Sequence, residues 1–127
     1  PAFARQLAAL AAGRAPAHMK VGNLESAREF MDVRDVATAY RLLLEMGRAG
    51  EAYNISTEQS VPVSNILDLL CHEAGVTPEL EVDPARYRPT DRQPVIRAGK
   101  LRADTGWTPR YSLKQTLADV YAWAASA

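Results

Sequence analysis

The run from residue 32 to residue 47 constrains the fold of this chain more than any other segment. Its apolar side chains recur at the spacing of one helical face: Val33, Val36, Ala37, Tyr40, Leu43 and Leu44. Asp32 precedes the run and can accept hydrogen bonds from the free N–H groups of the first helical turn. Asp35 favours the positive end of the helix dipole, and Gly47 ends the pattern. These signals predict an amphipathic helix over residues 33–46.

Similar start and stop signals predict four more helices. Pro62 opens an amphipathic run that Gly75 ends, and Ser112 and Gln115 have the spacing of a capping box. After this capping box, one helical face is apolar: Leu113, Leu117, Val120, Tyr121 and Ala124. The predicted helices therefore cover residues 3–12, before Gly13, residues 62–74, residues 100–105, and a last segment that begins after Ser112.

Extended segments alternate with these helices. Short strands are predicted at residues 18–24, 29–31, 51–56 and 80–82. Residues 83–99 contain three prolines and no periodic pattern, which predicts a long irregular loop, and loops of that length are usually functional. The expected fold is a mixed, helix-rich α/β fold, and 127 residues suit one domain over residues 1–127.

Composition excludes several classes of protein. The chain is 24% charged with a formal net charge of +0, which argues against disorder and against a generally basic nucleic-acid-binding protein. No run approaches the ~20 consecutive apolar residues that cross a bilayer. The single cysteine, Cys71, cannot form an internal disulfide and offers no paired thiols for a metal. It suits a reducing compartment, and we expect a cytoplasmic protein.

Charge is segregated along the sequence. Residues 49–85 carry seven acidic and no basic side chains, whereas residues 86–102 carry six basic side chains and one acid. Most of the acidic stretch is expected to be solvated surface. The arginine-rich loop suits an anion, because a planar guanidinium donates two parallel hydrogen bonds to phosphate.

Arg28 and Arg88 are the candidates for a diphosphate clamp, and the carboxylate of Asp91 could accept hydrogen bonds from sugar hydroxyls. The alternative is that these arginines are solvated or paired with a nearby acid such as Glu29 or Asp32.

Most catalytic templates are absent from the sequence. It contains no Gly-x-Ser-x-Gly, no His-Glu-x-x-His and no Cys-x-x-Cys. His18 and His72 are isolated, and Cys71 beside an apolar helical face suits a small buried side chain better than a nucleophile. Three aromatic side chains could line a base or sugar pocket; core packing is the better interpretation for Tyr53 and Trp107, and Tyr87 is left open.

Four motifs together resemble a known family: residues 21–36, residues 51–56, Arg-Pro-Thr-Asp at 88–91, and Gly-Trp-Thr-Pro at 106–109. Their order and spacing are similar to the C-terminal half of extended short-chain dehydrogenases that act on nucleotide sugars. Within that family the chain looks most like the GDP-6-deoxy-4-keto-mannose reductases and the GDP-mannose 4,6-dehydratases.

The resemblance implies that an N-terminal Rossmann domain holds NAD(P) and carries a Tyr-x-x-x-Lys motif. This sequence has neither that motif nor Gly-x-x-Gly-x-x-Gly. We therefore expect a substrate-binding fragment that binds no cofactor and is inactive alone. Its expected partners are a GDP-sugar and the Rossmann domain of the same protein, with a homo-oligomeric parent and neither nucleic acid nor membrane. Apolar side chains that faced the Rossmann domain should be exposed.

Carried over by position, Arg28 and Arg88 match the family's two diphosphate-binding arginines, and Asp91 stands where the dehydratases carry a ribose-contacting Glu. The pocket-lining segment corresponds to Val21, Asn23 and Leu24.

The dehydratases tend to have a Trp-Gly pair after the first arginine, whereas residues 29–32 here are Glu-Phe-Met-Asp. This favours a reductase that transfers hydride to a 4-keto sugar. A dehydratase or epimerase, and a binding module without chemistry, are the alternatives.

Overall fold

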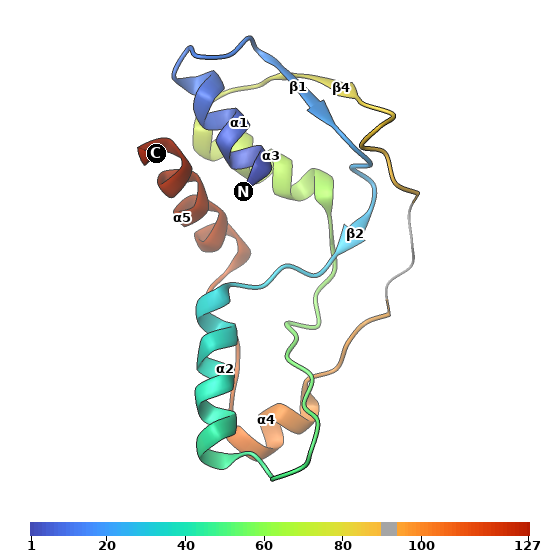
Figure 1. Cartoon of the computed structure of the whole chain (residues 1–127), viewed down its shortest axis with the longest axis vertical. Helices are drawn as coiled ribbons and strands as arrows, with labels where there is room; N and C mark the ends of the chain where they lie inside the picture. Colours follow the sequence, from blue (N-terminus) through green and yellow to red (C-terminus); the bar gives the residue numbers. More distant parts are fainter. Residues whose placement is uncertain (90–93) are drawn as a thin grey trace.

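The computed structural model describes residues 1–89 and 94–127. It is a mixed α/β fold in which helices predominate (Figure 1). The elements in chain order are α1 (Ala2–Ala11), β1 (His18–Val21), β2 (Ala27–Arg28), α2 (Val33–Met46), β3 (Val61–Pro62), α3 (Val63–Ala74), β4 (Glu79–Val82), α4 (Gly99–Thr105) and α5 (Leu113–Ser126).

One apolar cluster fills the end of the molecule where α1, α3 and α5 pack together (Figure 1). The strands β1 and β4 pair in parallel beside these helices, with Met19 opposite Leu80 and Val21 opposite Val82. Met19 and Val21 are buried because alternate side chains of a strand point to the same face. The centre of this cluster is Leu7, Leu67, Leu70 and Leu117 with the two β1 side chains.

A second apolar cluster lies at the opposite end, where α2 packs against α4. Its buried members are Ala39, Ala98, Leu101 and Trp107. The indole Nε1 of Trp107 donates to the backbone carbonyl of Asp35 at 3.0 Å, so the one polar atom of this buried ring is satisfied. Tyr53 packs against the same cluster and donates its hydroxyl to Asp104, which confirms that Trp107 and Tyr53 serve core packing.

The two ends are joined by β2 and β3 and by carboxylates of α2. The strands pair antiparallel, with Ala27 opposite Pro62. Asp35 is almost fully buried and accepts hydrogen bonds from the backbone N–H groups of Arg110 and Tyr111 at 3.0 and 3.1 Å. These contacts hold the segment between α4 and α5 against α2.

The predicted helices are confirmed. α2 has the expected bounds, and Asp32 caps it by accepting from the N–H of Arg34 at 2.9 Å. α3 ends at Gly75, whose φ of 66° lies in the left-handed region that favours glycine. Ser112 caps α5 by accepting from the N–H of Gln115 at 3.1 Å.

The strand predictions were less accurate. The strand at residues 80–82 is confirmed as β4. The one expected at 29–31 is instead β2, because the pairing with Val61 and Pro62 reaches only Ala27 and Arg28. Residues 51–56 form no strand, since no described segment lies alongside to exchange backbone hydrogen bonds with them. Their alternation is correct all the same, because Tyr53 and Ile55 pack against the second cluster.

α2 leaves an apolar stripe uncovered. Val33, Tyr40 and Leu44 are 76%, 61% and 90% exposed. The helix buries Asp35 and Ala39 instead. We expected exposed apolar side chains, and α2 carries them.

Among the described residues, no helix combines the length and apolar character required to span a bilayer.

Candidate functional site

An open pocket lies where the segment after β1 meets the start of the loop after β4. Its lining comes from several elements: Phe3, Gly22, Asn23, Leu24, Ser26, Arg28, Val63, Arg86 and Arg88. Three of these side chains are guanidinium groups, and none of the described lining residues is acidic. The pocket therefore has a positive electrostatic character that suits an anion.

Arg28 is held by the short sheet. It pairs with Val61 in the antiparallel β2–β3 pair, and its Nη1 donates to the carbonyl of Ala27 at 2.9 Å. The N-terminus of α3 docks beside it, because the N–H groups of Val63 and Ser64 donate to the carbonyls of Ser26 and Leu24, both at 2.9 Å. These bonds occupy N–H groups that a helix start leaves without intrahelical partners.

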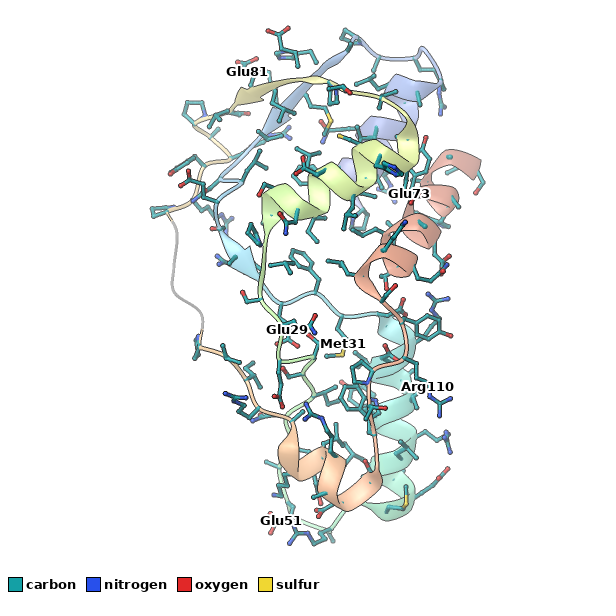
Figure 2. All side chains as sticks on the ribbon, turned by 180° about the vertical axis from the view of Figure 1, so that it is seen from behind. Glu29, Met31, Glu51, Glu73, Glu81 and Arg110 are labelled. Atoms are coloured by element: carbon teal, nitrogen blue, oxygen red, sulfur yellow. The ribbon has the colours of Figure 1, made fainter. Side chains whose placement is uncertain are left out.

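The two acids considered as partners for Arg28 have other partners. Glu29 lies in the middle of the molecule (Figure 2) and accepts from the N–H of Thr57 at 2.5 Å and from the hydroxyl of Ser56 at 2.9 Å. Asp32 accepts from Arg34 Nη2 at 2.7 Å. Glu29 thus fastens the segment before α2 to residues 56–57, and Asp32 holds the start of α2.

Arg86 and Arg88 come from the loop that follows β4. The loop begins with a turn in which the backbone carbonyl of Asp83 accepts hydrogen bonds from the N–H groups of Arg86 and Tyr87 at 2.9 and 3.0 Å. The Nε of Arg86 lies 3.3 Å from a carboxylate oxygen of Asp83. The backbone carbonyl of Arg88 accepts a hydrogen bond from the Nδ2 of Asn23, another lining residue of the pocket, at 2.9 Å.

The structure thus brings together four of the residues singled out from the sequence: Asn23, Leu24, Arg28 and Arg88. Val21 is buried in the first cluster beneath the pocket and does not line it. Asp91 lies outside the described residues. The half-exposed Tyr87 is not part of the pocket lining.

Sequence reasoning missed Arg86. The available signal is that Arg86 stands two positions before Arg88 in the same arginine-rich stretch. It also missed Gly22, which lies against the backbone of Arg86, 64 positions further along the chain.

The remaining candidates for chemistry have structural roles. His18 is exposed and pairs with Glu81 at 2.6 Å. Cys71 is partly buried, and burial together with the nearby charge of Asp68 raises the pKa of its thiol. Among the described residues, no group of His, Cys, Asp and Glu side chains is arranged to hold a metal ion.

Comparison with known proteins identifies the class. The family model described as GDP-mannose 4,6 dehydratase matches residues 2–120. The chain therefore belongs to this family of extended short-chain dehydrogenases/reductases.

Within the family, it is 36% identical to a GDP-6-deoxy-D-mannose reductase of Pseudomonas aeruginosa over 115 residues, which are 90% of this chain and 38% of that protein. It is 29% identical to a dTDP-glucose 4,6-dehydratase of Xanthomonas campestris, over 80% of this chain and 32% of that protein.

The fold agrees with this assignment. The structure of RMD from Pseudomonas aeruginosa complexed with NADPH superposes with a TM-score of 0.87 at 32% identity, covering 99% of this chain and 41% of that one. The chain thus spans between about a third and two fifths of the length of these relatives.

Proposed function

We propose that this chain is the substrate-binding part of an NAD(P)-dependent reductase that acts on a GDP-linked 4-keto sugar. The observation that carries the proposal is that Arg28 and Arg88, 60 positions apart, line one pocket together with Asn23 and Leu24. Two planar guanidinium groups that line one pocket suit the two phosphates of a nucleoside diphosphate. Similarity to a GDP-6-deoxy-D-mannose reductase supports the GDP-sugar as the ligand.

Each wall of the pocket has its own role. Arg28, fixed by the β2–β3 pair, and Arg88, on the loop, bind the diphosphate. Phe3 and Leu24 provide apolar surface against which the nucleobase packs. Asp91 is the proposed acceptor for the ribose hydroxyls.

In the whole protein, a nicotinamide cofactor held elsewhere supplies the hydride that reduces the 4-keto carbon. The residues of this chain bind the nucleotide far from that carbon, and such remote contacts orient the sugar for transfer. The chain alone binds without turnover, because its sequence lacks the Tyr-x-x-x-Lys and Gly-x-x-Gly-x-x-Gly motifs. The cofactor-binding part of the same protein covers the exposed stripe of α2.

A 4,6-dehydratase is the second candidate, because the matching family model carries that description. The two activities differ in their use of cofactor. A reductase oxidises one NAD(P)H for each keto sugar that it reduces, whereas a dehydratase converts GDP-mannose with no net consumption of reduced cofactor. Absorbance of NAD(P)H during turnover by the whole protein separates them, and turnover of neither substrate would favour a binding module without chemistry.

Calorimetric titration of this chain with GDP tests the binding role. Arg28→Ala and Arg88→Ala should each weaken GDP binding by about 10- to 100-fold, as expected for loss of a charge-assisted hydrogen bond of about 1.5–3 kcal/mol. Arg14→Ala removes the same charge from an exposed position outside the pocket and should leave binding unchanged. Equal GDP affinity in the wild type and both pocket variants would refute the proposed function.

A further inference from the structure

The turn that follows β1 contacts the arginine loop at unusually short range. A Cβ atom added to Gly22 would lie 2.5 Å from the carbonyl oxygen of Arg86, which is closer than real Cβ contacts allow. Only glycine therefore lets the loop backbone lie against this turn without a shift.

The next residue, Asn23, bridges the turn and the loop through both ends of its side-chain amide. Its Oδ1 accepts from the N–H of Glu25 at 3.0 Å and so shapes the turn itself. Its Nδ2 donates to the carbonyl of Arg88 at 2.9 Å, across 65 positions of sequence. The amide therefore fixes the backbone of the residue whose guanidinium is proposed to bind phosphate.

The beginning of the loop is fastened to β1 by other contacts. The N–H of Asp83 donates to the carbonyl of Val21 at 2.9 Å, and Arg86 Nη1 donates to the carbonyl of Lys20 at 3.3 Å. These contacts reach only to Arg86, whereas the Asn23 bond lies two residues further along.

We propose that Asn23 is a positioning residue of the nucleotide site, which acts on the diphosphate through Arg88, and that Gly22 provides the space for this arrangement. The inference rests on the proposed function, in which Arg88 binds the diphosphate. Arg88 is exposed, and a long exposed side chain on a loop loses conformational freedom when it binds. Holding its backbone in advance lowers that entropic cost.

A double-mutant cycle with GDP as the titrant tests this mode of action. Asn23→Ala should weaken binding by about 3- to 10-fold, the loss expected for one hydrogen bond. In the Arg88→Ala background the same change should alter affinity by less than about 2-fold, because the group that Asn23 positions is gone. An equal fold loss in both backgrounds would show that Asn23 contacts the nucleotide itself and would overturn the proposal.

Hydrogen exchange of the peptide covering residues 83–89 gives a readout that needs no ligand. Asn23→Ala and Gly22→Ala should accelerate exchange there, whereas Arg28→Ala should not. Asn65→Ala makes the same chemical change at an exposed site on α3 and should leave both exchange and GDP affinity as in the wild type.

Unchanged exchange in Asn23→Ala overturns the positioning role whatever the GDP result. Faster exchange in a chain whose GDP affinity is unchanged by Arg28→Ala and Arg88→Ala refutes the proposed function and leaves Asn23 with the fixing of the loop backbone alone.

Discussion

The hydroxyl of Thr116, on α5, donates a hydrogen bond to the carboxylate of Asp32 at 2.8 Å. The same carboxylate caps α2 at the N–H of Arg34 and accepts from the Nε and Nη2 of that side chain at 2.9 and 2.7 Å. Only 4% of the Asp32 side chain is exposed. One buried carboxylate therefore fixes the start of α2 to α5, and its hydrogen bonds compensate for its burial.

Asp32→Ala should lower the free energy of unfolding by about 2–4 kcal/mol, since it removes a helix cap together with the hydrogen bonds that Arg34 and Thr116 donate to this carboxylate. Urea denaturation measures the change. Asp119→Asn is the matched control, because Asp119 contacts the same Arg34 but is 42% exposed, and its loss should cost less than about 1 kcal/mol. Equal losses in the two variants would contradict the role assigned to Asp32.

The stability of the chain should depend on pH through the ionisation of Asp32. Hydrogen bonds from Arg34 hold the pKa of Asp32 far below its ordinary value of 3.8. Because the pKa in the folded chain is lower than in the unfolded one, the stabilisation is complete at neutral pH and is lost as the pH falls below about 5. In urea denaturation from pH 7 down to pH 2, the difference in the free energy of unfolding between wild type and Asp32→Asn should become smaller. A constant difference would show that ionisation of Asp32 contributes nothing.

The apolar stripe of α2 should make the chain self-associate when it is produced alone. Sedimentation velocity at rising concentration, and binding of an apolar dye, measure this. Tyr40→Glu combined with Leu44→Glu should suppress both, whereas Arg14→Glu, at an exposed position between α1 and β1, should not. A wild-type chain that stays monomeric and binds no dye would contradict the prediction.

Cys71 should react slowly with iodoacetamide. Burial and the charge of Asp68 raise the pKa of its thiol, so less thiolate is present near pH 8 than in a free cysteine. Its alkylation rate should lie below that of N-acetylcysteine and should rise to a similar value in urea. A native-state rate equal to that of the free thiol would refute this environment.

Helices could be predicted from the sequence because their signals are local. The Asp32 cap and Gly75 stop lie within a turn of the ends that they define. Strands depend on a partner, so the alternation at residues 51–56 could not say whether a neighbour would be present. Periodicity placed Val33, Tyr40 and Leu44 on one face of α2 but could not say what covers that face.

The candidate site, like the fold, could be predicted only in part from the sequence. That Arg28 and Arg88 belong to one site could be predicted, because their motifs resemble those of a family, and the two side chains do line one pocket. The contacts that position the arginine loop could not be predicted. The close approach of Gly22 to Arg86 and the hydrogen bond from Asn23 to Arg88 each join residues more than 60 positions apart.

The two apolar clusters are not two stretches of the gene. Along the chain, α1 and β1 contribute to the first, α2 to the second, α3 to the first, α4 to the second and α5 to the first. No single truncation can remove one cluster and spare the other. Deleting α1 or α5 removes part of the first cluster alone, and a longer deletion from either end reaches the second as well, so the separate contribution of each cluster is measured by point substitutions within it.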